Sequence, residues 1–229
     1  MSKKLIRVLI IAFILVIFWL IFQYMQEKQF EEEQLDFKPA GAPVVVTVFY
    51  EVLCPDSKNF VVKQLSTAYK KLPHLVDIAY VPYGKAITRV TKDGSLEFDC
   101  QHGPIECEGN IVHACTVDVI ADPTMRINLV ACMIADNMLP KDSFHRCAKE
   151  FGVHETESTK IIACSESPHG KELLKVYGEQ TAALRPKISF IPTVLLDGSQ
   201  RSQAAILKNL KQEICEVLTN RGTPPEVCT

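Results

Sequence analysis

The chain has 229 residues, a formal net charge of −2 and nine cysteines. This length accommodates one ordinary domain with extensions, and a core of useful size can be buried. The near-neutral charge, with no basic stripe carrying interleaved aromatic residues, gives no reason to expect nucleic acid as a partner. Nine cysteines indicate redox or metal chemistry in a reducing compartment, or a disulfide framework in an oxidising one.

The chain begins with a short basic segment and a long apolar run. As a helix rising about 1.5 Å per residue, Leu5–Met25 reaches about 30 Å, enough to cross a bilayer. Basic residues precede the run and glutamates follow it, so we expect the N-terminus to stay cytosolic and the rest to be translocated. A cleaved signal peptide is the alternative, although no A-x-A-like site follows the run. We predict a transmembrane signal anchor over residues 1–25 and an acidic stalk over residues 26–43.

The folded domain is predicted over residues 44–229. It opens with Val44–Tyr50, a β-branched and aromatic run typical of a strand covered on both faces. Apolar residues then recur at helical spacing until Pro73 ends the helix. Val76–Val81 predicts a second strand, parallel to the first through a right-handed crossover. This order predicts a βαβ unit.

The second half of the domain has a different pattern. Residues 85–185 predict a cysteine-rich, mostly helical insertion that prolines divide into short helices. Lys187–Ile191 and Thr193–Leu196 then predict a hairpin around Pro192, with an Asp-Gly turn after it. Residues 203–218 carry an apolar stripe and predict a closing helix. The complete order is that of an α/β, thioredoxin-like fold with a disulfide-rich helical insertion.

Cys54 is the candidate catalytic nucleophile, and we expect it to be exposed. It falls where the first strand ends and a helix begins, with Pro55 in the first helical turn. The unpaired amides and the helix dipole at this position favour a thiolate, whereas the neighbouring Asp56 opposes a second negative charge. The alternative is a buried, structural cysteine.

Ser57 stands where a C-x-x-C motif has its second cysteine. Its hydroxyl can donate a hydrogen bond to the Cys54 thiolate, but it cannot resolve a mixed disulfide. Three outcomes follow from this substitution. An external thiol such as glutathione releases the substrate, a long-lived covalent complex forms, or the site has no redox activity.

Ile191-Pro192-Thr193 follows the reactive-cysteine turn in the order that the thioredoxin fold requires. In that fold this proline is cis, and it packs beside the reactive sulfur where the preceding backbone pairs with substrate. An ordinary trans proline at the start of a strand is the alternative. We therefore predict catalytic roles for Cys54, Ser57 and Pro192, and substrate contacts from Pro55, Ile191 and Pro192.

A signature segment lies inside the insertion. It reads CQHG, two residues, EC, two residues, N, four residues and C, from residue 100 to residue 115. This pattern resembles the signature of the gamma-interferon-inducible lysosomal thiol reductase (GILT) family. The resemblance extends over roughly residues 44–228. The matching residues are Cys100, Gln101, His102, Gly103, Glu106, Cys107, Asn110 and Cys115.

The resemblance implies a thioredoxin fold and reduction of protein disulfides in an acidic endolysosomal lumen. Because of Ser57 we expect an external thiol such as glutathione as the reductant, and we expect no bound cofactor. The chain departs from the family in two respects. Ser57 replaces the dithiol partner, and no Asn-x-Ser/Thr sequon is present, although lysosomal sorting in the family depends on N-glycans. We expect a single-pass membrane protein of the secretory or endolysosomal pathway. Its folded domain is lumenal or extracellular, or secreted if the N-terminal segment is cleaved.

The remaining cysteines are expected to form disulfides. Without Cys54 eight remain, an even number that allows four bridges. Cys215 and Cys228 form the favoured pair, because a glycine and two prolines between them can fold the tail back onto the last helix. The other six are not assignable. Zinc is the alternative, but the spacing fits no common finger, and we expect no metal at the possible ligands Cys100, His102, Cys107 and Cys115.

Three functional hypotheses follow. The leading one is a thiol oxidoreductase that acts on disulfide-containing proteins through Cys54. The second is a binding protein on a redox scaffold, which holds clients in the proline groove or in a trapped mixed disulfide. The third is a purely structural membrane protein, which leaves the reactive-cysteine turn unexplained.

Overall fold

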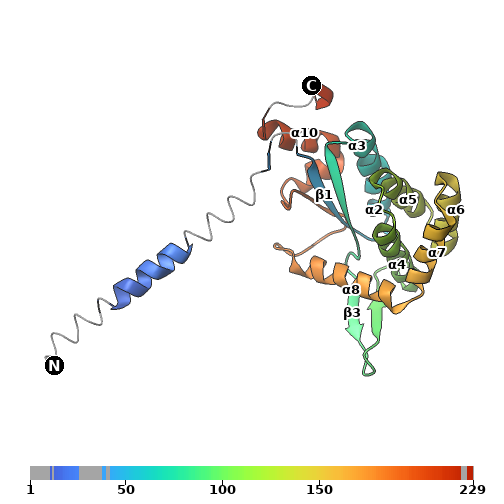
Figure 1. Cartoon of the computed structure of the whole chain (residues 1–229), viewed down its shortest axis with the longest axis horizontal. Helices are drawn as coiled ribbons and strands as arrows, with labels where there is room; N and C mark the ends of the chain where they lie inside the picture. The colour runs from blue at the N-terminus through green and yellow to red at the C-terminus, as the bar shows by residue number, and fades with distance from the viewer. Residues whose placement is uncertain (1–10, 12, 26–37, 40–41, 223–225, 229) are drawn as a thin grey trace. The chain divides into compact units, whose positions relative to one another are not determined.

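The computed structural model describes residues 11, 13–25, 38–39, 42–222 and 226–228. The chain divides into two compact units, Met1–Ala42 and Pro43–Thr229. Figure 1 shows the chain coloured from one end to the other.

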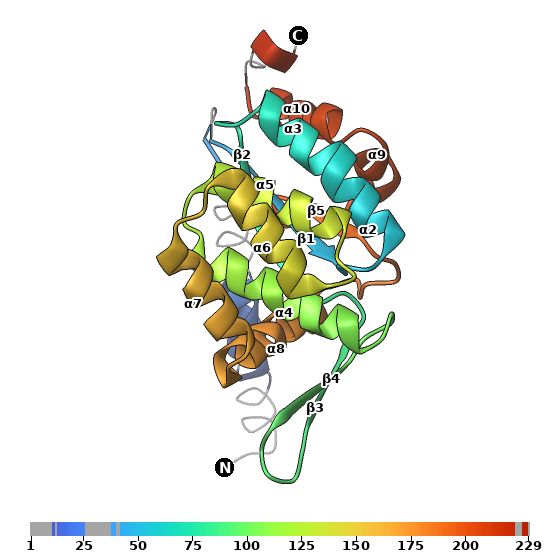
Figure 2. The same ribbon diagram turned by 90° about the vertical axis from the view of Figure 1, so that its right-hand side faces the viewer.

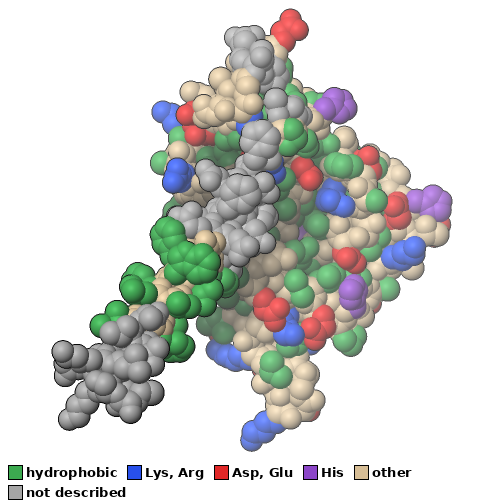
Figure 3. Space-filling model, turned by 60° about the vertical axis from the view of Figure 1, so that its left-hand side comes forward, with side chains coloured by type: hydrophobic (Ala, Val, Ile, Leu, Met, Phe, Trp, Pro, Cys, Tyr) green, Lys and Arg blue, Asp and Glu red, His purple; other side chains and the backbone are tan. Residues whose placement is uncertain are grey.

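In the first unit, residues 13–25 form a helix whose apolar side chains are exposed along its length (Figure 3). Within the described part of the chain, no helix combines the length and the apolarity needed to span a membrane. The predicted anchor over residues 1–25 begins outside the described residues, and most of the stalk over residues 26–43 also lies outside them. The anchor and the stalk therefore remain predictions.

A central sheet with the strand order β2-β1-β5 organises the second unit (Figure 1). β1 (Val44–Tyr50) pairs in parallel with β2 (Val76–Pro82), with Val44 opposite Val76. It pairs in antiparallel with β5 (Thr193–Leu196). The alternate residues of β1 that begin with Val44 are fully buried. The predicted parallel βαβ unit is confirmed.

The crossover helix begins directly after Cys54 and runs through three consecutive segments: α2 (Pro55–Asn59), the π-helical η1 (Phe60–Leu65) and α3 (Ser66–Lys71). The wider π-helical turn has no sequence signal and was not predicted. The apolar stripe that predicted the helix does face the core. Its members are all buried: Val61, Leu65, Ala68, Tyr69 and Leu72.

The insertion begins with a hairpin that the sequence pattern did not predict, in which β3 (Ile87–Val90) pairs in antiparallel with β4 (Leu96–Asp99). Most of its residues are exposed, so it lacks the apolar alternation that marks a half-buried strand. The rest is helical, as expected, and a proline opens all of these helices except α7. The helices are α4 (Pro104–Val119), α5 (Pro123–Ala135), α6 (Pro140–Phe151), α7 (Glu155–Ser165) and α8 (Pro168–Ala183).

The sheet is covered on both faces. The crossover helix, α5 and the C-terminal helices share one apolar core with the fully buried face of β1 (Figure 2). On the other face, Phe49, Val81 and Leu195 form a small cluster against Tyr177 of α8. A further core lies within the insertion, where residues of α4, α5, α6 and α7 pack together. This second core fixes α4 beside the end of β1.

The C-terminal part differs from the prediction in two places. Residues 187–191 form no strand. In β5 the N–H and the carbonyl of Val194 bond the side-chain amide of Gln203, so these two backbone groups have a partner other than a neighbouring strand. The Asp-Gly turn is present, with positive φ at both positions. The predicted closing helix is divided at Asn209, whose side chain caps the second part. The segments are α9 (Gln203–Lys208), α10 (Leu210–Asn220) and the 3₁₀ turn η2 (Glu226–Cys228).

Candidate active site

Cys54 lies at the junction of β1 and α2, with an extended backbone (φ −67°, ψ 122°) and Pro55 in the first helical turn. It is the free cysteine of the chain. Its Sγ lies 3.8 Å from the carbonyl oxygen of Ile191, a residue 137 positions away. The Ile191–Pro192 peptide is cis. The fold therefore brings together the two motifs that the sequence order paired.

The Cys54 sulfur is more enclosed than expected. Cys54 is only 8% exposed, so the expectation of an exposed thiol is wrong. The cause is the segment before β5, where the buried Ile191 places its carbonyl against the sulfur.

Ser57 supports the active-site turn from inside. It is fully buried, and its Oγ accepts a hydrogen bond from the N–H of Glu51 at 3.3 Å. The suggested hydrogen bond from Ser57 to the Cys54 sulfur is not formed between these two described residues. Since a hydroxyl forms no disulfide, Ser57 has no means of displacing a substrate held on Cys54.

The signature loop is closed by a disulfide between Cys100 and Cys107. Gly103 precedes α4 with φ 88°, a conformation that L side chains rarely adopt, and Pro104 follows in the first helical turn. The glycine of the signature thus turns the chain into α4. The disulfide ties the loop to the first turn of the same helix.

Helix α4 contacts the turn that carries Cys54. The side chain of Asn110 accepts a hydrogen bond from the N–H of Val52 at 3.2 Å, and Glu106 accepts one from the N–H of Leu53 at 3.3 Å. Both acceptor residues are fully buried. The two elements approach so closely at Gly109 that a Cβ there would lie 2.6 Å from Val52 Cγ2. The sequence pattern alone indicated no role for Gly109.

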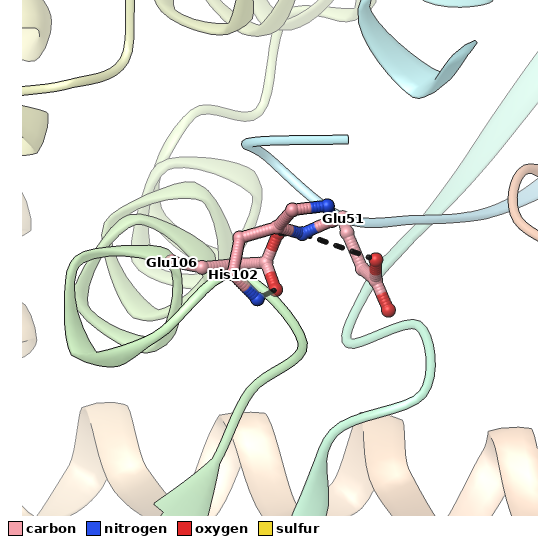
Figure 4. Close-up of side chains that lie close together, drawn as sticks. All are labelled: Glu51, His102 and Glu106. Atoms are coloured by element: carbon pink, nitrogen blue, oxygen red, sulfur yellow. Dashed lines mark hydrogen bonds and ion pairs between the residues drawn. The ribbon is translucent and has the colours of Figure 1, made fainter. Parts of the chain in front are cut away.

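Beside this contact, two buried carboxylates face one histidine (Figure 4). His102 Nδ1 lies 2.6 Å from Glu106 Oε2 and 3.7 Å from Glu51 Oε2. The N–H of His102 also donates to Glu106 Oε1 at 3.1 Å. The His102 side chain is 39% exposed, so it is the solvent-accessible member of the cluster.

Glu51 was not predicted as a site residue. Its Oε1 accepts a hydrogen bond from the N–H of Lys85 at 2.7 Å. When the Gln101 amide is oriented with its nitrogen toward Glu51, the orientation that satisfies its hydrogen bonding, it donates to both carboxylate oxygens at 3.1 and 3.2 Å. Burial raises the pKa of Glu51, the hydrogen bond from Lys85 opposes this rise, and the charge of Glu106 adds to it. Gly84 leaves room for this side chain, because a Cβ there would lie 2.1 Å from Glu51 Cγ.

Glu51, His102 and Glu106 also carry ligand atoms that lie within 4.8 Å of one another, the one such metal-type group among the described residues. The hydrogen bonds and the ion pair made by these three side chains are sufficient to explain why their ligand atoms lie close together. The zinc alternative drawn from the signature is wrong, because its three cysteines form disulfides. Cys100 pairs with Cys107, and Cys115 pairs with Cys164 of α7.

The other bridges complete the framework. Cys132 of α5 pairs with Cys147 of α6. Cys215 of α10 pairs with Cys228, the pair that the sequence favoured. All eight partners are thus assigned, and three of the four bridges lie within the insertion.

A buried histidine lies further along α4. His113 is fully buried, and its Nδ1 is 3.0 Å from the hydroxyl of Tyr50 in β1. Burial lowers the pKa of His113 to about 3, so its ring stays neutral in mildly acidic solution. The position was not predicted, although it follows Asn110 by three residues and therefore lies on the same face of the helix.

Solved structures of low sequence identity share this fold. MdbA, a thiol-disulfide oxidoreductase from Actinomyces oris, matches with a TM-score of 0.56 and 15% identity, over 80% of this chain and 82% of that one. DsbG, a disulfide bond oxidoreductase from Mycobacterium tuberculosis, matches with a TM-score of 0.50 and 18% identity, over 80% and 81% of the two chains. The second unit therefore has a thioredoxin-like α/β fold.

Sequence relatives identify the family. The model of the gamma interferon inducible lysosomal thiol reductase (GILT) family matches residues 45–151. GILT-like protein 1 of Drosophila melanogaster is 31% identical over 209 residues, which cover 82% of this chain and 80% of the relative. The gamma-interferon-inducible lysosomal thiol reductase of Mus musculus is 29% identical over 83% of this chain and 74% of its own. With its signature residues packed against the turn that carries Cys54, this chain belongs to the GILT family.

Proposed function

We propose that this protein is a thiol-disulfide oxidoreductase that reduces disulfides of protein substrates in a lumenal compartment of the secretory or endolysosomal pathway. The observation that carries the proposal is the free Cys54 sulfur, 3.8 Å from the Ile191 carbonyl at the cis proline. Four disulfides elsewhere in the chain support an oxidising compartment. The names of the relatives, which include a lysosomal thiol reductase, support the same reaction and place.

The reaction proceeds in three exchanges. The Cys54 thiolate attacks one sulfur of the substrate disulfide, which forms a mixed disulfide and expels the other substrate sulfur as a thiolate. A glutathione thiolate then attacks the Cys54 sulfur and releases the second substrate thiolate. A second glutathione thiolate then attacks the sulfur of the glutathione that is bound to Cys54. This step regenerates the Cys54 thiolate and yields glutathione disulfide. Two thiols are oxidised for each substrate disulfide that is reduced, and no bound cofactor takes part.

Ser57 explains why this scheme requires an external thiol. A cysteine at this position would attack the mixed disulfide within the same molecule, where its effective concentration far exceeds that of free glutathione. With serine at this position, release of the substrate from Cys54 depends on a bimolecular reaction with an external thiol. We therefore expect glutathione dependence and slow release.

The test compares the wild type with Cys54→Ser and Ser57→Cys. Reduction of a disulfide-bonded peptide is followed from pH 4 to pH 8 with excess glutathione. Cys54→Ser should lower the rate to the uncatalysed background, and Ser57→Cys should raise it by about tenfold or more. A wild-type rate equal to that of Cys54→Ser at every pH would refute the enzymatic proposal.

The second candidate function is client binding, which Ser57 specifically favours because a mixed disulfide on Cys54 has no internal route to resolution. In that case covalent complexes with client proteins accumulate, and added glutathione gives no turnover. The same assay decides between the two. Recovery of substrate bound to Cys54 without release of reduced product favours the binder.

A further inference from the structure

Four consecutive backbone N–H groups lead into the active site, and each has a hydrogen-bond partner. Those of Glu51 and Cys54 are satisfied within the turn, by Ser57 Oγ and by the Glu51 carbonyl, both at 3.3 Å. Those of Val52 and Leu53 depend on side chains of α4. The path of the turn is therefore set partly by a helix that begins 50 residues after Cys54.

Of the two acceptors on α4, Glu106 is the nearer to Cys54 along the chain, because its donor Leu53 directly precedes the nucleophile. Its carboxylate is fully buried and is held by three donors: the N–H of Leu53, and the N–H and ring Nδ1 of His102. Bonds to an ionised carboxylate are stronger than neutral ones. The Leu53 N–H is part-buried, so loss of this acceptor leaves a donor that water reaches only partly, and a shift of the backbone follows from that cost.

We propose that Glu106 is a positioning residue for the Cys54 reaction: it holds the N–H of Leu53 and thereby sets the Cys54 sulfur beside the carbonyl of Ile191. This inference rests on the proposed thiol-disulfide chemistry. Among the described contacts no hydrogen bond joins Glu106 to Cys54, so its effect passes through the Leu53 backbone. A displacement of about 1 Å at a reacting atom can lower a rate by about a hundredfold.

Three substitutions separate positioning from a general structural role. Glu106→Gln keeps the length of the side chain and an oxygen for the Leu53 N–H. Glu106→Asp keeps the charge but withdraws the carboxylate by one methylene. Glu106→Ala removes the acceptor. The matched control is Glu108→Gln on the same helix, because the Glu108 side chain is 47% exposed and, within the described part of the chain, forms its ion pair with Lys141 at 3.9 Å.

The measurements are kcat and KM for glutathione-dependent reduction of a disulfide-bonded peptide, and the rate of Cys54 alkylation by iodoacetamide in the folded protein. Glu106→Ala and Glu106→Asp should lower kcat by about tenfold to a hundredfold and leave KM within about twofold. Glu106→Gln should stay within about threefold of the wild type, and Glu108→Gln should match it. Both low-kcat variants should also show a changed alkylation rate.

The proposal is overturned if Glu106→Ala, with all four disulfides formed, matches the wild type in kcat and alkylation rate. If Glu106→Ala does not fold, Glu106→Asp decides, and wild-type behaviour of that variant overturns the proposal. Absence of turnover in the wild type, with altered alkylation in the variants, refutes the proposed function and leaves the positioning role intact. Turnover by the wild type, with kcat and alkylation rate unchanged in the Glu106 variants, supports the proposed function and refutes the positioning role.

Discussion

Two buried titratable side chains beside the active site respond to acid in opposite directions. Glu51 has a raised pKa, so its unfavourable contribution to stability is present at neutral pH and is lost as the pH falls through its folded-state pKa. His113 has a pKa lowered to about 3, so its folded form stays neutral while the unfolded chain takes up a proton near pH 6.5. As the pH falls, the contribution of His113 therefore lowers the stability of the fold, whereas the contribution of Glu51 raises it.

His113→Gln should reduce the acid sensitivity of the fold. Between pH 7 and pH 4.5, proton uptake by the unfolded state costs the wild type about 2–3 kcal/mol at His113, a cost that glutamine lacks. Glutamine can still accept a hydrogen bond from the hydroxyl of Tyr50, the partner seen in the structure. Urea unfolding at the two pH values measures the difference.

Glu51→Gln provides the opposite control for that experiment. It should be most stabilising relative to the wild type at pH 7 and should lose this advantage as the pH falls, because Glu51 then becomes neutral. An equal loss of stability by the wild type and His113→Gln between pH 7 and pH 4.5 would contradict the assignment of a neutral, buried His113.

At the scale of elements, α4 connects the insertion to the active site. Its first turns carry Glu106 and Asn110, which bond the turn before Cys54, and Cys115 further along pairs with Cys164 of α7. The bridge to α7 lies in the core of the insertion. Stability of the insertion core should therefore affect the geometry at Cys54, whereas the bridge at the end of α10 should not.

Removing the Cys115–Cys164 bridge should lower both stability and activity. A loop with a sequence separation of 49 residues corresponds to about 4 kcal/mol in the chain-entropy model. The Cys215–Cys228 bridge, with a separation of 13, corresponds to about 3 kcal/mol. The comparison uses double alanine variants of each pair, with urea unfolding and peptide reduction as the measurements.

The two bridges should differ most clearly in activity. Loss of Cys115–Cys164 frees α4 and should lower kcat, whereas loss of Cys215–Cys228 should leave the rate near that of the wild type in the folded protein. Equal rates for both variants would show that α4 keeps the active-site turn in place without help from the insertion core.

At the scale of the whole molecule, two properties of the mature protein can be measured together: which cysteine is a free thiol, and whether residues 1–25 are retained. Differential alkylation and mass spectrometry on protein isolated from its native source should find Cys54 labelled before reduction and the other eight cysteines labelled only after it. The N-terminal peptide should be present if residues 1–25 form an anchor. Labelling of a second cysteine before reduction, or a chain that begins beyond residue 25, would contradict the bridges or the anchor respectively.

The sequence by itself determined the parts of this protein that depend on local pattern. The β-branched run of β1, the helical spacing after Cys54 and the Cys-Gln-His-Gly signature were sufficient for the thioredoxin-like fold and the family, and the even number of remaining cysteines singled out Cys54 as the free thiol. The Cys215–Cys228 pair was also predictable, because its members are only 13 positions apart and a glycine and two prolines lie between them. Periodicity and short loops are encoded within a few neighbouring residues, so no knowledge of packing was needed.

Only the tertiary structure decided how these parts meet. Glu51, Gly109 and His113 have roles because α4 packs against the end of β1, a contact between segments some 50 residues apart. The Cys54 sulfur meets the carbonyl of Ile191, 137 residues further along the chain, and the backbone of Val194 meets the side chain of Gln203. Local pattern indicates neither contact. Burial and edge pairing are set by which distant segments compete for a surface, and that competition is resolved only when the chain folds.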